Sequence, residues 1–175
     1  GTAASSGNSS GPHLHFEVRT GSFKDTEWVD PYAGPNSQPE SLWASQRPYY
    51  DSAINRLTTH AAQPIETPCQ PTATNLQDSF STPARIQFYT YYRDYRSGLT
   101  TQFNIYRPDG SVFQTWQDIP ADNIFFSGKS LGRPVDLSAA EPAGTWRFEA
   151  VYNGTVYETF FNVNAPAAIS VTSPN

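Results

Sequence analysis

The stretch GTWRFEAVYNGTVYETFFNV, residues 144–163, contains the strongest hairpin signal in the sequence. Its centre is Asn153-Gly154, a pair favoured in two-residue type I′ turns because both central residues of that turn need a positive φ. Before this pair, apolar and polar residues alternate, as they do in a strand with one buried face. We expect the inward side chains to be Trp146, Phe148, Ala150 and Tyr152, with Arg147 and Glu149 facing outward.

Three segments upstream have the same strand character. Residues 85–92 and 99–106 alternate between apolar and polar, and residues 111–116 follow a Pro-Asp-Gly turn. In such a turn proline presets φ and glycine accepts a positive value. Strands at this spacing, with no helical pattern between them, favour an antiparallel immunoglobulin-like β-sandwich. We assign this sandwich to residues 72–165 and treat residues 166–175 as a tail.

The composition agrees with a mainly β protein and excludes several classes of partner. Only 15% of the 175 residues are charged, and fifteen prolines interrupt the chain too often for long helices. The net charge of −5 provides no basic patch, so we expect neither nucleic acid nor an anionic membrane surface as a partner. No apolar run reaches the roughly 18 residues of a membrane span. The single cysteine, Cys69, rules out an intrachain disulfide.

Residues 35–71 have the composition of a linker that packs on its neighbours. Pro, Ser, Gln and Asn are frequent here, with a few aromatic residues among them. Within this segment Ile54, Leu57 and Ala61 recur at helical spacing, so residues 50–60 are predicted to form one short helix. His60 is interpreted as a surface residue of the linker, and the alternative is a substitute zinc ligand.

A second informative stretch, GPHLHFEVR at residues 11–19, places two histidines one residue apart. Side chains alternate across a strand, so this segment has a polar and an apolar face. The polar face carries His13, His15, Glu17 and Arg19, and the apolar face carries Leu14, Phe16 and Val18. A strand of this kind directs two imidazoles into one cavity and anchors itself through its other face. Taken alone, the pair is weak evidence for a metal site, because two histidines on an exposed strand face are more often ordinary surface residues than zinc ligands.

The wider context of the pair resembles a known family. The residues SSGPHLHFEVR (9–19), followed by WVDPYAG (28–34), are similar to the C-terminal end of the peptidase domain in lysostaphin-like, LytM-type zinc endopeptidases. The resemblance implies that residues 1–34 are the last strand segment of that peptidase sheet. It also implies that His15 is a zinc ligand and that His13 is the catalytic histidine, which assists the metal-bound water and stabilises the oxyanion.

The same resemblance implies a setting and a substrate for the intact enzyme. It would be a secreted bacterial protein, at the cell surface or in the periplasm, with one zinc ion. Its substrate would be peptidoglycan cross-links or other Gly-rich peptides, which the metal-activated water hydrolyses. The sandwich would then be an accessory domain that positions or targets the peptidase.

The sequence departs from the family in its ligand count. The other two zinc ligands of the family come from an upstream His-X-X-X-Asp segment, and no such segment occurs in these 175 residues. We therefore expect a missing N-terminal peptidase half as the partner, present as a separate chain or encoded upstream. This chain alone should be inactive. For Glu17 two interpretations stay open, a carboxylate that orients a histidine or a simple partner of Arg19.

The sandwich contains one candidate binding surface. In RIQFYTYYRDYR, residues 85–96, alternation places Ile86 and Phe88 on one face and Tyr89, Tyr91 and Tyr95 on the other. An exposed tyrosine stripe would stack on sugars or receive a peptide. The alternative is aromatic pairing with neighbouring strands. The competing function for the whole chain is a non-catalytic cell-wall-binding, adhesive or structural module with a vestigial peptidase remnant.

Overall fold

The computed structural model describes residues 15–21, 27–35, 37–65 and 74–166. It divides the chain into two compact units, Gly1–Asp51 with Glu66–Thr72, and Ser52–Ile65 with Ala73–Asn175. The second unit is mainly β, as predicted, and no helix occurs among the described residues. The described part of the chain also contains no helix that is long and apolar enough to cross a membrane. His13 and Cys69 lie outside the described residues.

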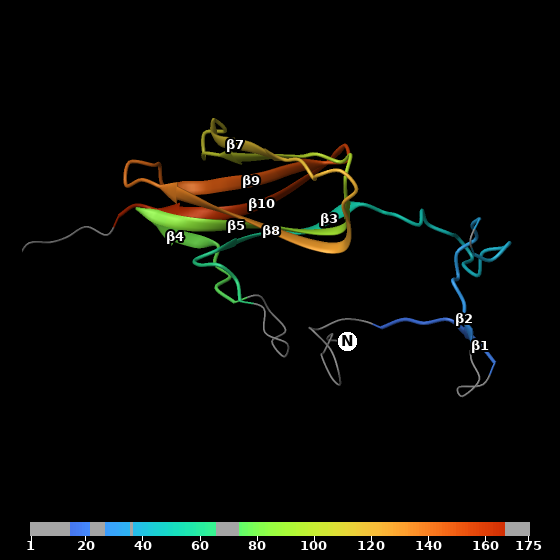
Figure 1. Cartoon of the computed structure of the whole chain (residues 1–175). Coiled ribbons are helices and arrows are strands. Elements are labelled where there is room, and N and C mark those ends of the chain that lie inside the picture. Colours follow the sequence, from blue (N-terminus) through green and yellow to red (C-terminus); the bar gives the residue numbers. More distant parts are fainter. Residues whose placement is uncertain (1–14, 22–26, 36, 66–73, 167–175) are drawn as a thin grey trace, which may run out of the picture. The chain divides into compact units, whose positions relative to one another are not determined.

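Two β-sheets pack face to face in the second unit (Figure 1). In spatial order, the larger sheet consists of β4 (Ser79–Ser81), β10 (Thr155–Asn164), β9 (Gly144–Tyr152), β6 (Thr101–Tyr106) and β7 (Val112–Asp118). The smaller sheet consists of β3 (Ala53–His60), β5 (Ala84–Arg96) and β8 (Phe125–Leu137). All neighbouring strands are antiparallel except β4 and β10, which pair in parallel. The sandwich is therefore not wholly antiparallel.

The hairpin of β9 and β10 has the predicted turn. Asn153 and Gly154 both have positive φ values, 49° and 75°, and Tyr152 pairs with Thr155 across the turn. Trp146 and Phe148 are fully buried, which confirms the inward face of β9. Phe148 reaches across the sandwich, where its ring centroid lies 5.0 Å from that of Phe88 on β5. These aromatic contacts join the two sheets into one core.

The prediction of a short helix over residues 50–60 is wrong, because β3 occupies Ala53–His60 and pairs with β5. The register shifts between Ile54 and Arg56, so β3 contains a bulge with one extra residue. Ile54 and Leu57 consequently face the core together although they stand three residues apart. That spacing imitates a helical period. The linker predicted for residues 35–71 therefore contains a strand of the sandwich.

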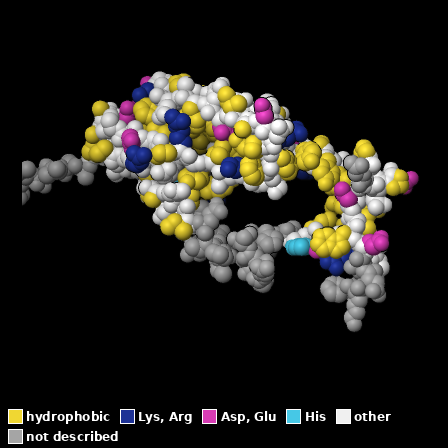
Figure 2. Space-filling view, viewed as in Figure 1, with side chains coloured by type: hydrophobic (Ala, Val, Ile, Leu, Met, Phe, Trp, Pro, Cys, Tyr) yellow, Lys and Arg dark blue, Asp and Glu magenta, His cyan; other side chains and the backbone are white. Residues whose placement is uncertain are grey.

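The N-terminal unit has little regular structure and no buried core among its described residues. Its two strands, β1 (Arg19–Thr20) and β2 (Glu27–Trp28), pair as a short antiparallel ladder. Phe16 contacts Trp43 with ring centroids 5.7 Å apart, yet 64% of Phe16 and 73% of Trp28 are exposed. Figure 2 shows hydrophobic side chains at the surface of this unit. Apolar groups of this size usually lie against another element.

Candidate functional site

Three of the four residues of the predicted polar face, His15, Glu17 and Arg19, belong to the described residues and contact one another. Nε2–H of His15 donates to Oε1 of Glu17 at 2.5 Å, and Nε–H of Arg19 donates to Oε2 of the same carboxylate. The three side chains therefore lie together, although residues 15–18 are not in the predicted strand and β1 begins at Arg19. The hydrogen bond from His15 is the main reason why the pKa of Glu17 is lowered from its ordinary value, and Arg19 adds to it.

This arrangement has a chemical consequence for His15. An imidazole that donates from Nε2 to a carboxylate carries its available lone pair on Nδ1. Carboxylates in this position orient the ligating histidines of zinc sites. Glu17 contacts both His15 and Arg19, so the two interpretations of this residue are compatible.

The described residues provide no complete metal site. They bring together no group of three or more His, Cys, Asp or Glu side chains that could hold a metal ion. A catalytic zinc site needs three protein ligands, and the resemblance implies only one of them in this chain, His15. The chain as described does not fit a complete zinc centre, and its dependence on ligands from elsewhere stays a prediction.

His60 is not a surface residue, contrary to our expectation. It lies at the end of β3 with its side chain fully buried. Its Nε2 is 2.7 Å from Oγ1 of Thr58, and its Nδ1 is 3.2 Å from the carbonyl oxygen of Thr74. The ring also contacts Tyr89 edge-on. Both ring nitrogens are engaged, so the structure gives His60 a packing role and not that of a substitute zinc ligand.

The stability of the sandwich should fall in mild acid because of His60. Burial lowers the pKa of His60 below its ordinary value of 6.5, so the unfolded chain binds this proton more readily than the folded chain. The free energy of unfolding is then highest above pH 6.5 and decreases as the pH falls below that value. Urea unfolding at pH 7.5 and pH 5.5 measures the decrease. His60→Gln should make this decrease in the free energy of unfolding smaller. His15→Gln, at an exposed position, should leave the decrease unchanged. An equal decrease in His60→Gln contradicts this assignment.

Tyr95 does not belong to the predicted outer stripe. Asp94 has a φ of 45°, and this left-handed residue breaks the alternation of β5. Tyr95 is buried as a result, and its hydroxyl donates to Oδ2 of Asp118 on β7 at 2.8 Å. The sequence pattern could not reveal a single left-handed aspartate within a long strand.

Tyr89 and Tyr91 are on the predicted outer face but are half-buried. The ring of Tyr89 lies across β8, because a Cβ added at Gly132 would stand 2.3 Å from its Cζ atom. The ring centroids of Tyr89 and Tyr91 are 6.2 Å apart. Packing across the neighbouring strand therefore accounts for much of this surface, and whether it also binds a ligand stays a prediction.

The contact between Tyr89 and Gly132 can be tested with a matched pair of glycines on β8. Gly132→Ala should displace the Tyr89 ring and lower the free energy of unfolding by about 1 to 3 kcal/mol, as overpacking does. Gly128→Ala should cost less, because its added Cβ would meet nothing closer than a backbone oxygen at 4.0 Å. In a Tyr89→Ala background the two alanine variants should differ little. A persistent difference there would show that another neighbour causes the strain.

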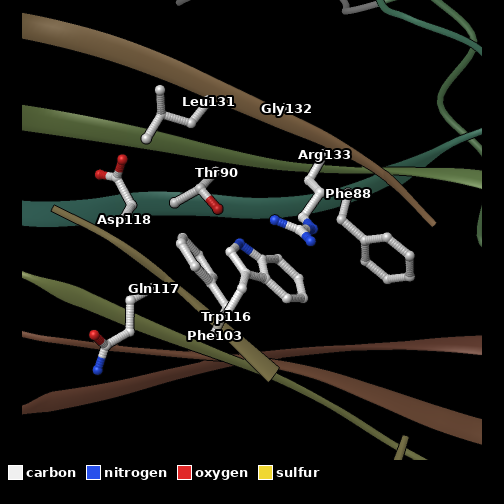
Figure 3. A pocket seen from close by; sticks show the side chains of 9 residues that line it. All are labelled: Phe88, Thr90, Phe103, Trp116, Gln117, Asp118, Leu131, Gly132 and Arg133. Atoms are coloured by element: carbon white, nitrogen blue, oxygen red, sulfur yellow. The ribbon is translucent and has the colours of Figure 1, made fainter. Parts of the chain in front are cut away.

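A groove lies at the open edge of the sandwich, between β7 and β8, and was not predicted from the sequence. Its cavity is about 210 Å³, and Figure 3 shows Arg133 above the indole of Trp116 and Asp118 at the opposite end. Arg133 pairs with the buried Phe88, so its side chain is on the inner face of β8 beside Leu131. A cation at an inward position of a strand was the available signal in the sequence.

Comparison with known proteins finds no family model that matches this chain and no curated protein that matches it. Function is therefore inferred from the chain's own residues.

Proposed function

We propose that this chain is the C-terminal portion of a secreted zinc endopeptidase, which hydrolyses peptide bonds in peptidoglycan cross-links or similar Gly-rich peptides. The observation that carries the proposal is the His13-Leu-His-Phe-Glu17 sequence, in which Glu17 holds the imidazole of His15. In this proposal His15 ligates the zinc ion, which supplies an activated water when bound. His13 assists the proton transfer and stabilises the developing negative charge.

The N-terminal unit has features that support a place in a larger domain. Phe16 is opposite the polar face and is largely exposed, with Trp43 as its aromatic neighbour. Two strands of two residues each are too short to be stable alone in water. A peptidase sheet that continues beyond these residues would cover the apolar face and contribute the remaining ligands.

The sandwich would serve this enzyme as an accessory domain outside the cell or in the periplasm. Its aromatic core is continuous and independent of the histidine segment. We propose that it positions the peptidase on the cell wall, with Tyr89 and Tyr91 as the candidate surface. The alternative, a non-catalytic binding or structural module, predicts no role for zinc in the intact protein.

Zinc content distinguishes these proposals. The 175-residue chain, purified alone, should bind no stoichiometric zinc with high affinity, because His15 is one ligand of three. The intact protein, with its upstream region, should contain one zinc ion and lose hydrolysis of peptidoglycan on chelation. Elemental analysis and a cell-wall digestion assay measure both. Nanomolar zinc in the isolated chain, lost in His60→Ala, contradicts the ligand assignment, and an intact protein without zinc or activity supports the non-catalytic alternative.

A further inference from the structure

The groove between β7 and β8 holds two opposite charges at its two ends. Arg133 extends its guanidinium over Trp116, with 4.9 Å from Cζ to the ring centroid. Asp118 accepts the hydroxyl hydrogen of Tyr95. Both residues line the same cavity. Among the described residues, neither Arg133 nor Asp118 forms an ion pair. Both charges are held in place without being neutralised.

The floor of the groove is rigid. Trp116 stacks on Phe103, with ring centroids 4.9 Å apart and an angle of 18° between the planes. It is also nearly parallel to Phe148, at 6.0 Å. A stacked indole fixes the guanidinium above it and weakens its hydration, which prepares Arg133 for a carboxylate. Tyr95 likewise fixes Asp118, so the ligand meets a site that is largely organised beforehand.

The lining argues against a sugar as the occupant. Sugars bind on a free aromatic face, whereas the ring of Trp116 is stacked with Phe103 and lies under the guanidinium of Arg133. The groove instead offers a cation, an anion and an apolar wall from Leu131 between two strands. A cavity of about 210 Å³ suits a ligand of amino-acid or dipeptide size.

We propose that this groove binds a short peptide with free termini. The carboxylate of the peptide pairs with Arg133, its ammonium group pairs with Asp118, and its apolar side chain contacts Leu131. The ligand provides an oppositely charged partner for Arg133 and another for Asp118, and the described residues supply neither. This site belongs to the sandwich and is independent of the peptidase proposal.

Three dipeptide probes test this charge pattern on the 175-residue chain. Ala-Leu has both charges, N-acetyl-Ala-Leu lacks the ammonium group, and Ala-Leu-amide lacks the carboxylate. The indole N–H signal of Trp116 in an NMR titration reports binding, and it is assigned by its loss in Trp116→Phe. We expect Ala-Leu to bind with a Kd of about 1 mM, the range for a ligand of this size. Each blocked probe should bind about 10- to 100-fold more weakly, as the loss of a charge-assisted hydrogen bond predicts.

Variants of the protein then show which charge meets which end. Arg133→Gln should weaken Ala-Leu by the same factor as amidation does and have no further effect on Ala-Leu-amide. Asp118→Asn, whose amide oxygen can still accept from Tyr95, should weaken Ala-Leu by the same factor as acetylation does. It should have no further effect on the binding of N-acetyl-Ala-Leu. The matched controls are Arg85→Gln and Asp136→Asn, which alter an exposed ion pair of the same sandwich. They should leave all three affinities unchanged.

Several results would overturn the proposal. One is the absence of any Trp116 shift with Ala-Leu at tens of millimolar, and another is equal binding of the three probes. Equal weakening by the Arg85 and Arg133 variants would mean that net charge, not the groove, attracts the peptide. Binding of N-acetylglucosamine in preference to Ala-Leu would assign the groove to a neutral sugar.

Discussion

Phe148→Ala is expected to lower the free energy of unfolding of the sandwich by about 3 to 5 kcal/mol. Phe148 has no exposed surface, and its ring contacts Phe88 from the opposite sheet and Phe103 from the neighbouring strand. Truncation leaves a cavity between two sheets that cannot close without moving the strands. A loss of this size is a large part of the stability of an ordinary domain. Urea unfolding followed by circular dichroism measures it.

Phe160→Ala on β10 is the matched control, because Phe160 is 55% exposed and faces outward. We expect it to cost less than about 1 kcal/mol, since little apolar surface returns to water. Similar losses in the two variants would contradict the placement of the core. Phe148→Ala should also loosen Trp116, whose ring is parallel to that of Phe148, and thereby broaden its indole signal.

The sequence predicts the hairpins of this sandwich well because their signals are local. Asn153-Gly154 adopts the positive φ values that its residue types favour, and strict alternation on β9 identifies the buried aromatics. These features depend on neighbours within a few residues. The sandwich class follows from the number and spacing of such strands.

Errors occur where one residue interrupts the period of a strand. The bulge after Ile54 changes the spacing of inward residues from two to three, and a strand then looks like a helix. Asp94 reverses the alternation of β5 and carries Tyr95 into the core. Both irregularities depend on pairing with strands distant in the sequence, which a local pattern does not contain.

The sequence predicts a candidate site only where the residues of that site are near one another in the chain. Alternation alone places His15, Glu17 and Arg19 together. The structure confirms that these side chains contact one another, although residues 15–18 are not in a strand. The groove needs Trp116 from one sheet and Arg133 from the other, so only the packing of the sandwich brings them together. His60 is buried because residues around Thr74 return to it, which its sequence neighbours do not reveal.

Under the proposed function, His15→Ala in the intact protein should remove zinc and peptidase activity together, because the variant would lack a proposed ligand. His13→Ala should leave zinc largely bound while kcat falls by about 10²- to 10⁴-fold, the range for general acid–base and oxyanion-stabilising groups. Zinc content by elemental analysis and hydrolysis of a Gly-rich peptide measure the two effects separately. Equal loss of zinc in both variants would mean that the two roles are assigned wrongly.

Variants of Glu17 provide a further test of the role of His15, because the Glu17 carboxylate is hydrogen-bonded to the His15 ring. If it orients a ligand, Glu17→Gln should weaken zinc binding by about 10- to 100-fold, whereas Arg19→Gln should have little effect on zinc. A carboxylate that serves only as the ion-pair partner of Arg19 gives the opposite result, with zinc affinity unchanged in both variants. His60→Gln should bind zinc normally, because its site is in the sandwich and both nitrogens of the native ring are already engaged. The order of zinc affinity, with His15→Ala weakest and Glu17→Gln intermediate, would therefore be the specific signature of His15 as a zinc ligand.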